Sequence, residues 1–334
     1  MKKHSKLPVP SMALITAAFM ASLALGTSAI AQEAWKPSKT VEIVVGSAAG
    51  GGNDKSARAL QKVLSESGVT ESVVLNKTGA GGGLAYGYVS QKKDPHFIGI
   101  AQGGIMSNHI SGRSELDPLT DVTPLSYMGN EAVAIAVRSD SPYKNITEFV
   151  EQLTKDPASL AISVGSDRGG VNHGAVALLA KERGINPNQL KIVIFSGGAE
   201  SVTNLLGGHI DAMSQLQNNA IPHHQSGAMR ILCLTSDQRA QAVPDVPTCK
   251  EEGFDVVMTN WTVVIGPKSL TEEQVKGWEA VLRDANASPT WKALIESVAG
   301  DGRYMDSATT REFLKEDYAQ AKDLMTELGL AKKQ

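Results

Sequence analysis

Four glycine-rich segments combine residue types and spacing that suit ligand chemistry. Each lies between a short apolar run and a stretch of helical spacing, and they cover residues 46–54, 79–83, 165–173 and 196–198. Glycine permits positive φ and lets backbone N–H groups approach a ligand. A helix amino terminus adds free N–H donors and about half a positive charge. Together the segments predict an anion site at the strand carboxyl ends, although any one alone is also explained as a tight turn.

Few charged side chains are placed to assist an anion site. Arg168 is the one lysine or arginine inside a glycine segment, and its guanidinium either pairs with a carboxylate or stays solvated. Asn53 and Asp54 fit the first turn of a helix, where capping is sufficient to explain them. We expect Asp54 to brace its loop rather than contact the ligand, because a carboxylate beside an anion is costly. His173 lies where a helix should begin after a glycine segment, so we expect it to cap the helix or brace the loop.

Catalytic and cofactor motifs are missing from the sequence. No G-x-G-x-x-G fingerprint, phosphate loop, G-x-S-x-G elbow or H-E-x-x-H pair occurs. His223 and His224 are adjacent, so on a regular element their side chains would point apart rather than share a metal. We therefore predict no enzymatic activity, no cofactor and no metal. The alternative is an exported enzyme for a small acid, with Asp54, Asp167 or His173 carrying protons.

The amino terminus has the pattern of a secretory signal peptide. Lys2, Lys3 and Lys6 precede an apolar run over residues 12–25, and Ala29-Ile30-Ala31 supplies small residues for cleavage after Ala31. The run is shorter than the ~20 residues of a membrane-spanning helix. We expect a periplasmic protein that starts at Gln32.

Composition limits the class of protein and of partner. The 334-residue chain has 42% hydrophobic residues and a net charge of -3, and loss of three lysines with the leader leaves 29 basic and 35 acidic residues, a net of -6. This charge argues against nucleic acid as a partner. Cys233 and Cys249 form either one disulfide or two separate buried thiols, and the spacing leaves both open.

Alternating short apolar runs and amphipathic stretches predict an α/β fold with mostly parallel sheets. The runs expected to be strands cover residues 41–45, 73–75, 96–101, 133–137, 160–164, 192–195, 210–213, 231–235 and 256–265. Extended crossings near 133–138 and 256–262 predict an inserted domain. We expect domain 1 to comprise residues 32–137 plus 259–334, and domain 2 to comprise residues 138–258.

Several motifs resemble one family. The motifs are the segments at residues 45–58, 76–83, 140–144, 165–173, 205–211, 244–248 and 260–261. In this combination and order, the chain resembles the solute-binding receptors of tripartite tricarboxylate transporters, the TctC or Bug family, over nearly all its mature length. The closing Glu327-Leu328-Gly329-Leu330 resembles the citrate-receptor branch.

The resemblance implies a type II-like, two-lobed periplasmic binding protein, with two Rossmann-like domains joined by two extended crossings. Such a receptor closes on a di- or tricarboxylate and delivers it to a membrane permease of one large and one small subunit. We expect a monomer. The alternative partner is a membrane sensor kinase that reads the same liganded form.

The resemblance also implies the ligand contacts. In the first domain, loop N–H groups and ordered water would hold one carboxylate at Ser47, Ala48, Ala49, Gly50, Gly51, Asn53, Thr78, Gly79, Ala80, Gly81 and Gly82. In the second, the variable end of the ligand would lie against Ser166, Arg168, Gly169, Gly170, Asn172, Ser196, Gly197, Gln217 and Asn218. The chain departs from the citrate branch at Ala49, Asn53, Arg168 and Thr262. The last two departures lie near the selective end and change which carboxylate spacing is matched.

Overall fold

The structure is a computed structural model, and it describes Met1 and residues 35–332 apart from 48, 51, 80–81, 165–167 and 196. Apart from Met1, the predicted signal peptide therefore lies outside the described residues. All the elements below belong to one compact unit, Trp35–Gln334.

The described chain alternates strands and helices. The strands are β1 Val41–Val45, β2 Ser72–Asn76, β3 Phe97–Ala101, β4 Val122–Arg138, β5 Ala161–Ser163, β6 Lys191–Val193, β7 Ala212–Leu216, β8 Met229–Leu234 and β9 Thr259–Pro267. The helices are α2 Gly52–Glu66, α3 Gly83–Ser90, α4 Gly104–Ile110, α5 Ile146–Lys155, α6 Val171–Lys181, α7 Gly198–Leu206, α8 Ile221–Gln225, α9 Glu272–Ala287, α10 Pro289–Ser297 and α11 Ser307–Glu327, with 3-10 turns η2 Pro187–Gln189 and η3 Gln217–Asn219.

The strands form two lobes that share β4. The order is β2-β1-β3-β9-β4-β7-β5-β6, and β8 also pairs with β4. We call the half with β1, β2, β3 and β9 the first lobe, and the half with β5 to β8 the second lobe. The sheet is mixed, which corrects the expectation of mostly parallel strands: β3–β9, β4–β9, β4–β7 and β4–β8 are antiparallel. The described chain is thus an α/β protein of two lobes.

Strand β4 connects the lobes. It pairs with β9 from Val122 to Ala132 and with β7 from Val133 to Val137. The sequence pattern predicted only its second half, because Pro124 and Gly129 look like strand breakers. The register with β9 shifts beside both residues, and such bulges let a strand continue past a proline or glycine.

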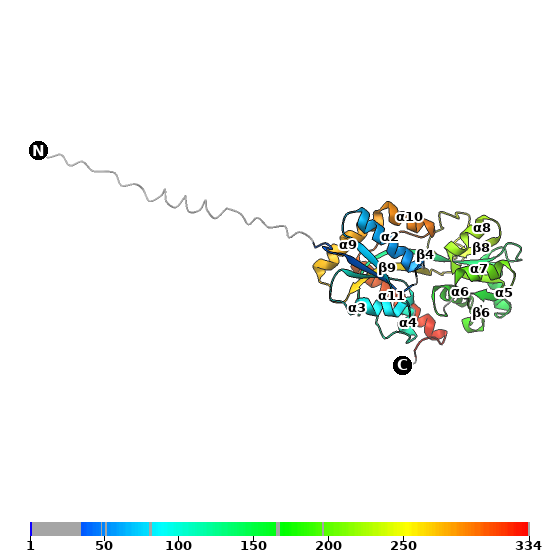
Figure 1. Ribbon diagram of the computed structural model, residues 1–334. Helices are drawn as coiled ribbons and strands as arrows, with labels where there is room; N and C mark the ends of the chain where they lie inside the picture. Colours follow the sequence, from blue (N-terminus) through cyan, green and yellow to red (C-terminus); the bar gives the residue numbers. More distant parts are fainter. Residues whose placement is uncertain are drawn as a thin grey trace. The chain divides into compact units, whose positions relative to one another are not determined.

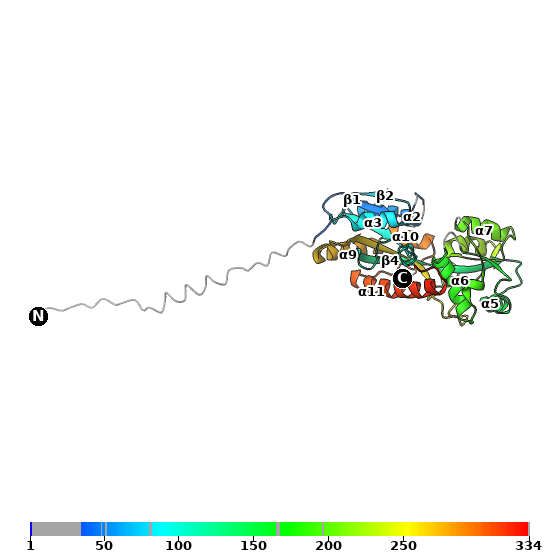
Figure 2. The ribbon, with the colours of Figure 1, turned by 90° about the horizontal axis from the view of Figure 1, so that it is seen from below.

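Each lobe has its own apolar core. In the first, α2, α9 and α10 cover one face of the sheet around Trp278 and Trp291, and α3, α4 and α11 cover the other. In the second, α5 and α6 pack around Phe149, while α7 and α8 cover the opposite face. Figure 1 shows α5 to α8 around this second half of the sheet. Figure 2 shows α11 extending beside β4, on which it packs.

Cys233 of β8 and Cys249 form a disulfide, and both are fully buried in the second-lobe core. The bridge joins β8 to the segment after it, where Leu234 also pairs with Thr248. Separately, none of the helices in the described residues is long and apolar enough to span a bilayer.

Replacing both cysteines by alanine should lower the free energy of unfolding by about 2–4 kcal/mol. The bridge closes a loop with a sequence separation of 16, so its loss releases unfolded-chain entropy and removes buried volume. Urea unfolding followed by circular dichroism measures the change. Ser297→Ala, at an exposed position at the end of α10, is the control and should cost less than about 0.5 kcal/mol of the free energy of unfolding. An unchanged midpoint in the double variant would contradict a structural role for the bridge.

Candidate functional site

The four glycine segments lie where strands end and helices begin. They connect β1 to α2, β2 to α3, β5 to α6 and β6 to α7. Six predicted ligand residues lie outside the described residues: Ala48, Gly51, Ala80, Gly81, Ser166 and Ser196. The remaining candidates are all in the described part of the chain. They can therefore be placed individually.

Three of the helices that follow glycine segments have glycine at the N-cap, whereas the first turn of α2 donates the Asp54 N–H to the Ser47 hydroxyl at 3.2 Å. The N-cap residues of α3, α6 and α7 are Gly82, Gly170 and Gly197, which have no side chain with which to cap the helix. By contrast, the starts of α5, α9, α10 and α11 are capped by the side chains of Asn145, Thr271, Ser288 and Asp306. The first N–H groups of a helix have no partner within the helix. With glycine at the N-cap of α3, α6 and α7, no N-cap side chain competes with water or an anion for these donors.

Asp54 braces the β1–α2 loop. Its Oδ2 accepts the Gly50 N–H at 2.8 Å and the Arg58 Nε–H at 2.9 Å, while Oδ1 accepts from Asn76 at 2.9 Å. These bonds, chiefly that of Arg58, lower the pKa of Asp54 to about 2 although the side chain is buried. The oxygens of Asp54 thus face donors of the loop, of α2 and of β2.

The two first-lobe loops touch each other. A Cβ on Gly46 would lie 2.4 Å from the Cα of Gly82, so only glycine lets the loops approach this closely. Gly82 also has a φ of +95°, which favours glycine. Asn76 adds a link by donating to the Ser47 carbonyl at 2.9 Å. Ser47 is half-buried here, whereas Ala49, Gly50, Thr78 and Gly79 are exposed.

A buried polar cluster supports the second-lobe loops. The Ser163 hydroxyl donates to that of Ser201 at 2.6 Å, and Gln215 donates to Ser201 at 2.9 Å. Asn172, a predicted ligand residue, donates to the Gln215 side chain at 3.2 Å. Because Ser163, Ser201 and Gln215 are buried, the cluster fixes the starts of α6 and α7 relative to β5 and β7.

His173 closes the β5–α6 loop. Its Nδ1 accepts the Gly169 N–H at 3.0 Å, and the imidazole is buried. Gly169 has a φ of +87°, and Gly170 is extended. The contact makes His173 a loop brace.

The η3 segment meets the strand that connects the lobes. Asn218 donates its backbone N–H to Glu131 Oε1 at 2.9 Å, and the buried side chain of Gln217 donates to the carbonyls of Val298 and Ala299. Burial raises the pKa of Glu131 to about 7, although the Asn218 bond and the charge of Lys55 oppose the shift. Sequence reasoning missed Glu131, because an isolated glutamate in an apolar run carries no motif.

The cations near the loops are largely engaged or exposed. Arg168 is exposed, and its guanidinium donates to the Ile192 carbonyl at 3.4 Å. The ammonium group of Lys77 lies 4.2 Å from the ring centroid of Tyr88, and Lys55 is exposed. The loop donors are therefore mainly backbone N–H groups.

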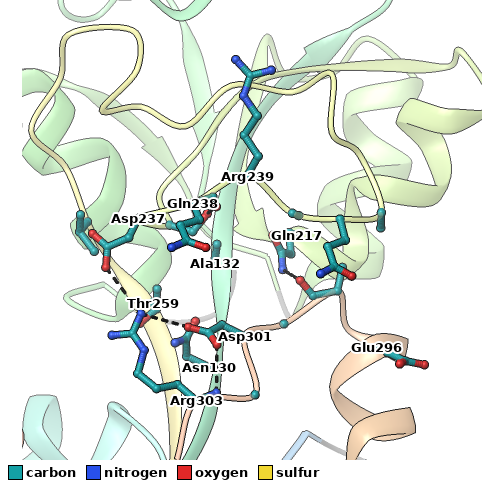
Figure 3. Close-up of a pocket in the computed structure, with 18 of the residues that line it drawn as sticks. Asn130, Ala132, Gln217, Asp237, Gln238, Arg239, Thr259, Glu296, Asp301 and Arg303 are labelled. Carbon is teal, nitrogen blue, oxygen red and sulfur yellow. Dashed lines mark hydrogen bonds and ion pairs between the residues drawn. The ribbon is translucent and has the colours of Figure 1, made fainter.

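Two cavities lie where elements of both lobes meet. One of about 590 Å³ is lined by Asn130, Gln217, Gln238 and the turn at residues 299–303, with Arg303 paired to Asp301 at 3.1 Å and Asp237 at 4.0 Å (Figure 3). The other, about 290 Å³, is lined by Gly169 and Gly170 together with Gly103, Gly104 and Trp261. Gly103 and Gly104 begin α4 after β3, a fifth glycine junction that sequence reasoning missed. A short glycine pair after the apolar run 97–101 was the available signal.

Comparisons with known proteins identify related chains. The family model described as Tripartite tricarboxylate transporter family receptor, TctC, matches residues 56–330. A UPF0065 protein in the gbd 5' region of Cupriavidus necator is 27% identical over 320 residues, 94% of this chain and 96% of that protein. Protein BugT of Bordetella pertussis is 24% identical over 88% of this chain and 90% of its own length.

Solved structures share the fold. A TctC solute-binding protein from Polaromonas, without ligand, has a TM-score of 0.77 at 24% identity and covers 87% of this chain and 99% of its own. MatC from Rhodopseudomonas palustris with bound malate has a TM-score of 0.70 at 23% identity, and the match covers 86% of this chain and 99% of MatC. Another R. palustris protein, with adipate, has a TM-score of 0.75 at 22% identity, and the match covers 88% of this chain and 99% of that protein.

Asp54→Asn should lower the free energy of unfolding by about 1–3 kcal/mol at pH 7, since it removes a charged acceptor of three hydrogen bonds. The folded pKa, about 2, lies below the ordinary value of 3.8. The higher free energy of unfolding of the wild type, relative to Asp54→Asn, is therefore present above about pH 4 and lost as the pH falls through about 2. Chemical unfolding at several pH values measures it. Asp140→Asn, at an exposed pair with Arg138, is the control. A difference that persists undiminished at pH 2 would contradict the bracing role.

Proposed function

The chain belongs to the tripartite tricarboxylate transporter receptor family, and from this membership we propose that it is a periplasmic, non-catalytic receptor for a small di- or tricarboxylate. The ligand binds between the lobes, where the starts of α2 and α3 and those of α6 and α7 supply its contacts. The leader is removed after Ala31. The domains are residues 32–137 plus 259–334 and residues 138–258.

The observation that carries this proposal is the contrast between capped and uncapped helices. Helices α3, α4, α6 and α7 have glycine at the N-cap and no side-chain cap, as α8 has none at Ala220, whereas α5 and α9 to α11 are capped by a side chain. An oxyanion accepts several such N–H donors at once and is favoured by the helix dipole. A carboxylate therefore suits these positions in a protein of net negative charge, in which the overall field does not attract anions.

The proposed ligand residues are those that the resemblance implies in both lobes. Asn172 is suited to hold a polar ligand group, since its Oδ1 is buried and has no hydrogen-bond partner among the described residues. A ligand that bonds to both lobes gains its full set of contacts only when they approach, so it shifts the open and closed populations by its differential affinity. Closure then marks the loaded receptor for the transporter permease.

The relatives guide the choice of ligand. Malate and adipate, each bound to a structural relative from R. palustris, are dicarboxylates of different length. We propose a ligand of this class and delivery to a membrane permease. Arg168 sets the preferred spacing if its exposed guanidinium turns from Ile192 to the far carboxylate.

Gly197→Asp should abolish carboxylate binding and leave the fold intact. Gly197 has an extended backbone, with φ 172° and ψ -175°, and a Cβ there would meet no atom within 4 Å. The new carboxylate would cap α7 and occupy the N–H groups proposed for the ligand. Isothermal titration with a panel that includes malate, adipate, succinate and citrate measures the loss.

The matched control removes a cap from a helix outside the site. Asn145→Ala at α5 should cost about 1 kcal/mol of stability and leave affinity unchanged. If the wild-type protein binds none of the acids in the panel, the proposed function is overturned. Wild-type affinity in Gly197→Asp would remove α7 from the site, and turnover of a bound acid would overturn the non-catalytic assignment.

A further inference from the structure

Glu131 is a buried carboxyl at the point where the lobes meet. It lies on β4 opposite Asn260 of β9, and only 8% of the residue is exposed. Two positions later, at Val133, the same strand begins to pair with β7. Its Oε1 accepts the backbone N–H of Asn218, in the η3 segment proposed to hold the ligand. Glu131 thus touches the candidate site without belonging to a glycine loop.

The charges around Glu131 do not neutralise it. From α2, Lys55 acts on it electrostatically, but no ion pair joins Glu131 to a cation of the described residues. The turn after α10 contributes Asp301, whose backbone bonds to that of Asn130 and whose side chain pairs with Arg303. β9 and η3 contribute the uncharged Asn260 and Asn218.

An unpaired buried carboxylate is costly, so the neutral acid is favoured. The pKa of about 7 given by burial places the change of charge near neutral pH. Lys55 lies in the first turn of α2, directly after the first-lobe loop, while Asn218 belongs to the second lobe. An anion bound near these two elements adds negative charge close to Glu131, and it raises the cost of the ionised form further.

We propose that Glu131 takes up one proton from solvent when the receptor captures a dicarboxylate, and that this side chain makes binding depend on pH. The inference rests on the proposed function and adds a residue that controls affinity. Neutral Glu131 accepts the Asn218 N–H and places no charge opposite the ligand. Ionised Glu131 keeps the bond but repels the ligand. Affinity therefore falls as the pH rises through the range in which Glu131 of the free receptor loses its proton.

The test measures proton uptake and affinity with malate and with adipate as probes. Titration calorimetry at about pH 7.5 in buffers of different ionisation enthalpy should give an uptake approaching one proton per ligand. The dissociation constant should rise on the order of tenfold between about pH 6.5 and 8.5, where both probes are ionised. Glu131→Gln keeps an oxygen for the Asn218 N–H and should show neither effect. The exposed Glu151→Gln on α5, which lines neither cavity, is the control and should behave as wild type.

Each outcome decides between the proposals. Binding by the wild-type protein without proton uptake, or the same uptake in Glu131→Gln, overturns the role of Glu131 and leaves the proposed function standing. If neither acid binds, carbon-detected NMR titration of the glutamate carboxyl groups decides the inference. A signal titrating near pH 7 that disappears in Glu131→Gln supports it, and a Glu131 signal near its ordinary value of 4.5 overturns it.

Discussion

The proposed site depends on the starts of α3, α6 and α7, where glycine at the N-cap offers no side chain to the backbone N–H groups of the first turn. Gly82, Gly170 and Gly197 begin α3, α6 and α7, where a serine, threonine, asparagine or aspartate would satisfy the first turn. Glycine at these N-caps gives up the stability that a side-chain cap adds, while Asn145, Thr271, Ser288 and Asp306 cap helices elsewhere in the described chain. An anionic ligand would recover the lost bonds. A protein with more acidic than basic residues then needs no cluster of lysines to bind a carboxylate.

The polar groups around the loops hold these donors in place. Asp54 ties the β1–α2 loop to Arg58 and Asn76, and its low pKa keeps it charged. Ser163, Ser201 and Gln215 perform the corresponding task under α6 and α7 without any charge. Glu131 differs from both groups because it is a carboxyl without an ion-pair partner among the described residues. That difference leads us to assign it a proton-linked role rather than a purely structural one.

Sequence patterns predicted the strands and the glycine junctions, because apolar runs and glycine pairs are local signals. The strand expected at residues 41–45 has those bounds, and all four predicted junctions connect a strand to a helix. The first half of β4 was missed, since bulges beside Pro124 and Gly129 depend on pairing with β9. Glu131 and Gln215 were missed for a related reason. Their importance comes from burial and from partners far away in the chain, which one sequence does not reveal.

The most direct test of the central claim is a backbone amide NMR titration with a carboxylate that binds in the panel. We expect large downfield shifts for first-turn amides of α3, α6 and α7, such as those of Val171 and Asn172, because an oxyanion accepts hydrogen bonds from them. First-turn amides of the capped helices α5 and α9 should shift little. Saturable binding that leaves the amides of α3, α6 and α7 unchanged would contradict the account.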